Sequence, residues 1–200
     1  DTRAVDSVRA VVYRLVADDV PTRLVTQLQI DVSGSVREEV FGPILPDGFV
    51  PLNLQSRLPA RFEADGNLRL QVRPGRWQIT LTARAPAVID ELSRPADGTN
   101  LPETEIWSYR SNDRLRVTAV EGLPPVDPRQ AQVPDPWTQL PAFRVAAGES
   151  MTRRPWSSSR STRSATARRS SPSSAVSRLV IVTSDGSRST SSQCCCSTGS

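Results

Sequence analysis

Two runs of alternating apolar and polar residues, separated by a Pro-Gly pair, constrain the fold of this chain more than any other feature. Residues 68–73 alternate strictly, and residues 77–85 alternate again after Pro74-Gly75. Alternation at every second residue buries one face of a strand and leaves the other in water, whereas a helical repeat would scatter the same apolar residues around the axis. Pro followed by Gly suits the centre of a type II turn. We therefore predict that the two runs pair as an antiparallel β-hairpin, with Trp77 in the core.

Other segments also have the character of short strands. A turn signal at Asp65-Gly66-Asn67 precedes the hairpin, and similar signals recur about every 8–12 residues, which is typical of a β-sandwich or barrel. The predicted strands are residues 8–17, 22–32, 36–41, 49–55, 60–64, 106–110 and 115–121. Alternation is imperfect in the first of these, so a short helix is an alternative there. Residues 86–105 lack periodicity and are predicted to form a long loop.

These patterns predict an all-β fold, an antiparallel β-sandwich with a disordered C-terminal tail. We assign residues 1–121 to the sandwich domain. Residues 122–150 form a Pro-rich extended segment, packed across the domain or acting as a linker, because six Pro in residues 122–143 exclude a central strand or a long helix. Residues 151–200 form the Arg/Ser-rich tail.

The tail differs sharply from the rest of the chain in charge. Residues 1–150 hold 17 Arg and 20 acidic residues, whereas residues 151–200 hold 8 Arg, 17 Ser and one acidic residue. The sequence pI of 9.6 therefore belongs to the tail and does not indicate a basic face on the domain. A segment with so few apolar residues cannot offset the entropy of ordering its chain.

Three origins of the tail are open. It is a natural disordered segment, a folded segment, or the product of a shifted reading frame near residue 150. The last fits a GC-rich gene, which the 25 Arg and the absence of Lys suggest. In each case the basic tail could bind polyanions without specificity, but it lacks the interleaved aromatic residues of specific RNA readers.

The residues around the predicted hairpin resemble a known class of β-sandwich domains. The pattern of Asp-Gly, alternating strand, Pro-Gly, aromatic residue and second alternating strand in residues 65–85 resembles prealbumin-like β-sandwiches of the carboxypeptidase-regulatory-like and collagen-adhesin B types. The resemblance implies a sandwich used as a spacer or binding module rather than an active site. Some of those adhesin modules contain a Lys–Asn isopeptide bond, which this chain cannot form because it has no Lys. Residues 122–130 and 137–143 also resemble segments of large uncharacterised exported proteins of proteobacteria, which implies no activity.

The residue types needed for most catalytic chemistry are missing. The chain has no His, which removes the usual general base and a common metal ligand. Its three Cys are contiguous at residues 194–196, so they cannot staple the domain. Adjacent acidic pairs such as Glu38-Glu39 would point to opposite faces of a strand and would not converge. We therefore expect no enzyme activity, no catalytic residues, no cofactor and no metal site.

Two aromatic residues give the sequence its only candidate ligand site. Trp107 and Tyr109 share one face of a predicted strand, where they could form a platform for a sugar ring. The alternative is that they belong to the core.

The first hypothesis for function is a non-catalytic structural or protein-interaction module. A carbohydrate-binding module and polyanion binding by the tail are the alternatives. The partner would be another protein or other domains of the same longer chain, since the sequence starts at Asp1 rather than Met. The resemblances suggest export to the periplasm or cell envelope of a bacterium. No apolar run reaches the roughly 18–20 residues of a membrane span, so no transmembrane segment is expected.

Overall fold

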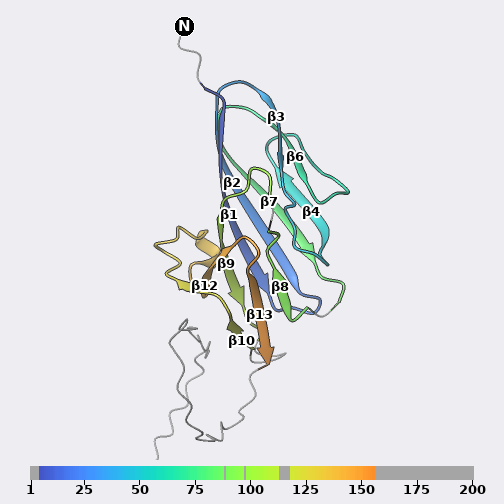
Figure 1. Ribbon diagram of the computed structural model, residues 1–200, viewed down its shortest axis with the longest axis vertical. Coiled ribbons are helices and arrows are strands. Elements are labelled where there is room, and N and C mark those ends of the chain that lie inside the picture. The colour runs from blue at the N-terminus through green and yellow to red at the C-terminus, as the bar shows by residue number, and fades with distance from the viewer. Residues whose placement is uncertain (1–4, 88, 97, 113–117, 156–200) are drawn as a thin grey trace, which may run out of the picture.

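The computed structural model describes residues 5–87, 89–96, 98–112 and 118–155 (Figure 1). Among these residues the secondary structure is β-strand except for one short 3₁₀ helix, η1 (Asp135–Trp137), which confirms the predicted all-β class. The strands are β1 (Ser7–Ala17), β2 (Arg23–Ser33), β3 (Arg37–Phe41), β4 (Val50–Ser56), β5 (Ala60–Phe62), β6 (Leu68–Val72), β7 (Gly75–Arg84), β8 (Glu91–Ser93), β9 (Thr104–Arg110), β10 (Thr118–Glu121), β11 (Pro125–Val126), β12 (Ala142–Ala146) and β13 (Ser150–Pro155).

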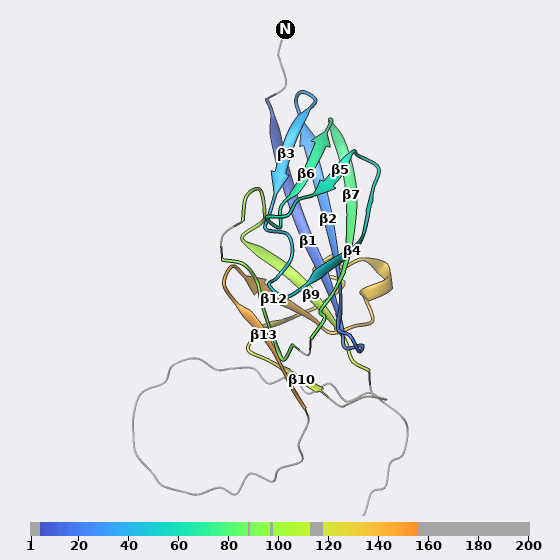
Figure 2. The same ribbon diagram turned by 90° about the vertical axis from the view of Figure 1, so that its right-hand side faces the viewer.

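The strands form one large sheet and two small ones. The large sheet has seven strands in the order β11-β12-β9-β1-β2-β7-β4, and the small sheets have the orders β10-β13-β8 and β3-β6-β5. Neighbouring strands are antiparallel except β1 and β9, which run parallel. In Figure 2 the sheet β3-β6-β5 lies over one end of the large sheet, and β10 and β13 lie towards the opposite end.

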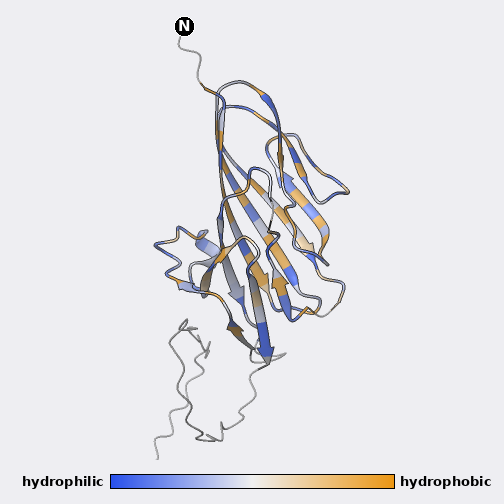
Figure 3. Cartoon of the chain, viewed as in Figure 1, coloured by the Kyte–Doolittle hydropathy of each residue, from blue (hydrophilic) through white to orange (hydrophobic). Residues whose placement is uncertain are grey.

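All three sheets contribute to one core. A single cluster of buried apolar side chains includes Val12 and Leu28 from the large sheet, Leu70 from β6 and Met151 from β13, each at most 1% exposed. In Figure 3 apolar and polar residues alternate along the long strands, as expected where one face is buried. The large sheet is therefore one layer of a sandwich, and the two small sheets together form the other.

A second buried cluster covers part of the outer face of the large sheet. Tyr13 and Leu15 of β1 pack there with Val133 and Trp137 from the Pro-rich segment. Successive strand residues point to opposite faces, so the second half of β1 is buried on both sides. This explains why residues 8–17 alternate imperfectly although they form a strand and not a helix.

The predicted hairpin across Pro74-Gly75 is wrong, although both of its strands exist. β6 pairs with β3 and β5, whereas β7 pairs with β2 and β4, so the two strands belong to opposite layers. At Pro74-Gly75 the chain crosses from one layer to the other, and Gly75 takes a φ of 130°, which L side chains rarely adopt. Alternation reports only which face is buried, and the apolar faces of β6 and β7 meet the same core from opposite sides. The Asp65–Asn67 turn does join antiparallel neighbours, β5 and β6.

The predicted domain boundaries also need correction. Of the two forms predicted for the Pro-rich residues 122–150, the packed one holds and the linker does not. The segment contains β11, η1 and β12, β12 pairs with β9, and Val133 and Trp137 pack on the large sheet. Residues 151–155, assigned to the tail from sequence, lie in β13. The predicted loop at 86–105 contains β8. The predictions for the tail from residue 156 onward fall outside the described residues.

Candidate functional site

Trp107 and Tyr109, the ligand-binding pair expected from sequence, are both 0% exposed. β9 lies between β1 and β12 in the large sheet, and both side chains belong to the common core. The Trp107 indole donates a hydrogen bond to Glu105 (2.7 Å), and the Tyr109 hydroxyl donates one to Asp18 (3.0 Å). Neither ring offers a free face to a sugar, so the predicted platform is wrong and the core alternative holds.

The same face of the large sheet holds a buried guanidinium–carboxylate pair. Arg14 of β1 donates from Nε and Nη2 to the two oxygens of Glu105, at 2.6 and 3.0 Å. Its Nη1 donates to the Thr26 hydroxyl (3.1 Å) and to the Ile44 carbonyl (2.7 Å). Arg14 is 0% exposed, and its guanidinium carbon lies 5.7 Å from the centre of the Trp107 ring. Every acceptor of this arginine is therefore inside the protein.

Arg94, one residue beyond β8, supplies a second positive charge to the same carboxylate. Its Nε lies 3.2 Å from Glu105 Oε1. Its Nη1 donates to the carbonyls of Glu103 (2.5 Å) and Val145 (3.2 Å), and its Nη2 donates to the Pro102 carbonyl. Glu105 thus joins strand β9 to β1 and to the segment that follows β8.

The ionisation of Glu105 depends on these neighbours. Burial raises the pKa of its carboxyl, but the charge and hydrogen bonds of Arg14, the Trp107 indole and the charge of Arg94 outweigh burial and hold the pKa below its ordinary value. Glu105 is therefore ionised at neutral pH. It is 1% exposed, so a substrate has no access to it. The cluster stabilises the fold rather than carrying out chemistry.

A second buried ion pair lies at the end of β1. Arg153 of β13 donates from Nη1 to Asp18 Oδ1 (2.9 Å) and to the Thr22 hydroxyl (3.3 Å). The other oxygen of Asp18 accepts the hydrogen bond from Tyr109. The side chains of Arg153 and Asp18 are 1% and 0% exposed. This cluster connects β1, the β1–β2 turn, β9 and β13.

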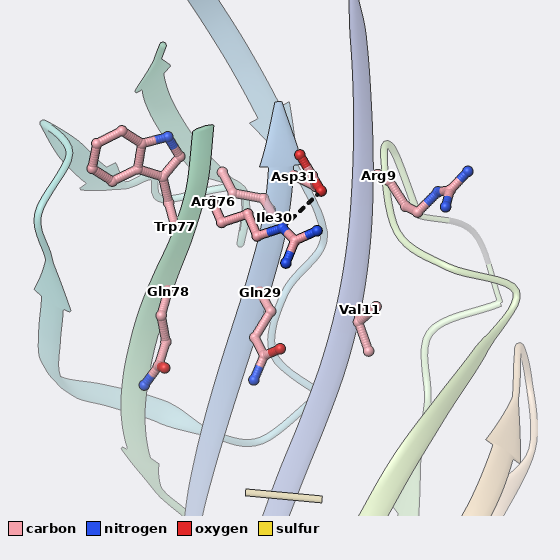
Figure 4. Close-up of a pocket in the computed structure, with 8 residues that line it drawn as sticks. All are labelled: Arg9, Val11, Gln29, Ile30, Asp31, Arg76, Trp77 and Gln78. Atoms are coloured by element: carbon pink, nitrogen blue, oxygen red, sulfur yellow. Dashed lines mark hydrogen bonds and ion pairs between the residues drawn. The ribbon is translucent and has the colours of Figure 1, made fainter. Parts of the chain in front are cut away.

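The surface around Trp77 is the best exposed candidate for a binding site. A depression of about 440 Å³ is lined by residues of three adjacent strands. We call it the Trp77 surface; its residues are Arg9 and Val11 of β1, Gln29, Ile30 and Asp31 of β2, and Arg76, Trp77 and Gln78 of β7 (Figure 4). A second depression of about 520 Å³ shares Arg76, Trp77 and Gln78 and extends to Gln55–Arg57. Trp77 therefore borders both hollows.

Trp77 lies on the core face of β7, as predicted, but it is only partly buried. It packs against the core cluster, as its alternation with Ile79 and Leu81 predicts. It is the third residue of β7, beside the connection from β6, and its indole donates a hydrogen bond to the Arg73 carbonyl (2.8 Å). The Arg73 guanidinium lies 4.6 Å from the ring centre, so one face of the indole is occupied.

The polar side chains of the Trp77 surface are largely in solvent. Arg76 and Asp31 form an ion pair at 3.2 Å with side chains that are 89% and 56% exposed. Such a pair contributes at most about 1 kcal/mol to stability, so a ligand can displace it at little cost. In Figure 4 Arg76 reaches across the sheet to Asp31, while the indole lies on the other side of the β7 ribbon. The outer face of the sheet thus offers hydrogen-bonding amides and two charges, whereas the indole, which alternates with Arg76 and Gln78 along β7, belongs to the opposite face.

Other kinds of site receive no support from the described residues. No group of three or more acidic, Cys or His side chains in the described part of the chain is arranged to hold a metal ion. None of the helical structure described there is long and apolar enough to cross a membrane. Comparisons of the chain with protein-family profiles and with curated proteins find no match.

Proposed function

We propose that this chain is a non-catalytic β-sandwich module that serves as an in-line structural or protein-interaction domain of a longer, exported bacterial protein. One observation carries the proposal: β1 begins at one end of the elongated domain, and β13 ends at the opposite end (Figures 1 and 2). A domain whose chain enters and leaves at opposite ends extends a longer protein along its axis. A prealbumin-like spacer, which the resemblance in residues 65–85 implies, would have this use.

The interior supports the same proposal. Buried ion pairs connect strands that lie far apart in the sequence, namely Arg14 with Glu105 and Asp18 with Arg153. Buried charges that face an opposite charge resist separation, because either partner left alone would be an uncompensated charge in a dry core. The Asp18–Arg153 pair thus joins the two layers, and the Arg14–Glu105 pair joins two neighbouring strands of the large sheet.

The test is whether copies of the domain align end to end. Two copies of residues 1–155, joined directly, are compared with one copy by small-angle X-ray scattering. An in-line module gives a maximum dimension close to twice that of the single copy. A maximum dimension near that of one copy would show that the domains fold back on each other and would refute the in-line arrangement.

Carbohydrate binding remains the second candidate, now at the Trp77 surface rather than at Trp107 and Tyr109. The observation that favours it is the partly exposed indole between two hollows lined by Gln and charged side chains. Binding sites for small ligands combine an apolar surface with a few placed polar groups. Because Arg73 covers one indole face, a sugar would stack on the other face or displace the guanidinium.

This candidate is tested by calorimetric titration with a panel of neutral and acidic oligosaccharides. We expect Trp77→Ala and Gln78→Ala to abolish any binding that the unaltered chain shows. Arg144→Ala, an exposed arginine on β12 and so on a different part of the large sheet, is the matched control and should bind normally. No titration by any oligosaccharide, or equal binding by all three variants, would contradict the candidate. Polyanion binding by the tail concerns residues outside the described ranges and stays a prediction from composition.

A further inference from the structure

The first and last strands of the described domain are tied together by the Asp18–Arg153 pair. Asp18 directly follows β1, and Arg153 lies within β13. Their charged atoms are 2.9 Å apart and shielded from solvent, and Thr22 and Tyr109 each add one hydrogen bond, to Arg153 and to Asp18 respectively. An ion pair shielded from solvent is little weakened by salt. It therefore forms a persistent link between strands that are over 130 residues apart in the chain.

Tension applied between the two ends of the domain would run along these strands. β1 runs away from its end of the molecule, and β13 runs towards the opposite end (Figures 1 and 2). Inter-strand hydrogen bonds lie across the strands, so a pull along a strand loads all of them together rather than one after another. Both terminal strands are thus loaded in shear, the arrangement that resists extension.

The two terminal strands are held unequally by their neighbours. β1 pairs with β2 over eleven residues and with β9 over five. β13 pairs with β10 over four residues and with β8 over three. Under equal tension β13 would slide out first, because it has fewer hydrogen bonds to share the load. The buried Arg153 side chain lies on this weaker strand.

We propose that the domain bears tension along its long axis and that the Asp18–Arg153 pair is the clasp that prevents β13 from sliding out of its sheet. For β13 to move, Arg153 must leave Asp18 while both are still inside the protein, which is costly for a buried pair. The clasp passes load from the weakly held last strand directly to the end of the firmly held first strand. This inference rests on the proposed in-line function, because only an in-line domain is pulled at these two ends.

Single-molecule pulling tests the clasp. The full chain is placed between two marker domains of known unfolding force, and its unfolding rate is measured at constant force. We expect Arg153→Met to raise that rate by at least about tenfold. Removing one partner of a buried pair is strongly destabilising. Because the pair ruptures early on the unfolding path, its loss accelerates unfolding. Asp18→Asn should behave in the same way, and Arg153→Lys, which keeps the charge, should recover part of the resistance.

The control removes comparable stability away from the line of force. Leu70 lies on β6, and its side chain is 0% exposed, so Leu70→Ala creates a cavity. The sheet that contains β6 includes neither β1 nor β13. We expect Leu70→Ala to accelerate unfolding in urea without force about as much as Arg153→Met, yet to change the rate under force much less. Equal changes under force for the two variants, or no change for Arg153→Met, would overturn the proposal. If Arg153→Met does not fold, Asp18→Asn and Arg153→Lys give the same comparison. Failure here is separable from failure of the in-line function, because the scattering experiment on joined copies applies no force.

Discussion

Replacing Glu105 by Gln should destabilise the protein more than any other change of a single carboxylate to an amide among the described residues. Glu105 is the only negative charge that contacts both Arg14 and Arg94 in the described part of the chain. Glutamine keeps the shape of the side chain but removes the charge. Its amide would also place a donor where the Arg14 and Trp107 donors now point. Two buried guanidinium groups would then lack their counter-ion.

The magnitude follows from the burial of the groups involved. Arg14 is 0% exposed, Glu105 1% and Arg94 5%. Removing one partner of a pair buried to this degree costs about 3–5 kcal/mol. The free energy of unfolding of a domain is only about 5–15 kcal/mol. With a urea dependence of about 2 kcal/mol per molar, the unfolding midpoint of Glu105→Gln should fall by about 2 M.

Urea unfolding at pH 7, followed by circular dichroism, measures this loss. The matched control is Glu38→Gln on β3, because Glu38 pairs with Arg69 on the surface, with side chains 42% and 34% exposed. That pair should contribute less than about 1 kcal/mol. A midpoint for Glu105→Gln within the range of this control would refute the reasoning, since it would mean that water reaches the Glu105 cluster.

The pH dependence gives an independent check on the same residue. The folded-state pKa of Glu105 lies below the ordinary pKa of a glutamate, so its contribution to stability is complete above the unfolded-state pKa. The contribution is lost as the pH falls through the lower folded-state pKa. The difference in unfolding free energy between the unaltered chain and Glu105→Gln should therefore be constant near neutrality and shrink in acid. A difference that grew in acid would contradict the direction of the shift.

Three further predictions concern the Trp77 surface, the Pro-rich segment and the end of the domain. In thermal melts, Trp77→Ala should lower the free energy of unfolding by roughly 2 kcal/mol, which is less than the loss at a fully buried tryptophan. Gln78 is exposed, so Gln78→Ala should lower it by under about 0.5 kcal/mol. Trp137 of the Pro-rich segment is 8% exposed, and Trp137→Ala should lower the free energy of unfolding in urea by about 3 kcal/mol. A loss below about 1 kcal/mol would mean that the segment is a detachable linker. A chain ending at residue 155 should have a free energy of unfolding within about 1 kcal/mol of that of the full chain, but it should elute from heparin at lower salt. A chain ending at residue 150 should be far less stable, because it lacks β13. Equal midpoints for the two shortened chains would show that β13 contributes nothing.

The sequence predicts individual strands well and their partners poorly. Residues 22–32, 36–41 and 106–110 appear as β2, β3 and β9 with small changes of boundary, because a strand's alternation is local information. Pairing is not local. The alternation of residues 68–73 and 77–85 is the same whether the two strands lie side by side or face each other across the core, and only the rest of the fold decides between the two.

The sequence left two forms open for the Pro-rich segment, one packed across the domain and one acting as a linker. Pro excludes residues from the interior of a sheet, but this does not decide between the two forms. However, a segment that lies over the face of a sheet needs few backbone hydrogen bonds, and it can still bury side chains. Trp137 and Val133 do so against Tyr13 and Leu15. The imperfect alternation of residues 8–17 was the available signal that something covers the second face of that strand.

The buried ion pairs also left a signal in the sequence, one that concerns the position of charges within the alternation. Arg14 occupies the same parity as Val12 and Val16, and Glu105 the same parity as Trp107 and Tyr109. A charged residue that alternates in step with the apolar residues of a strand points towards the core. It must therefore be paired inside the protein, or it must lie at the edge of the core, where solvent reaches it. Two such residues of opposite sign on two strands therefore predict a buried pair between those strands. Arg153 and Asp18 could not be found in this way, because Asp18 follows the end of its strand and Arg153 lies in an Arg-rich context that resembles a tail. The pair that holds the last strand to the first is thus the part of the molecule that only the three-dimensional structure reveals.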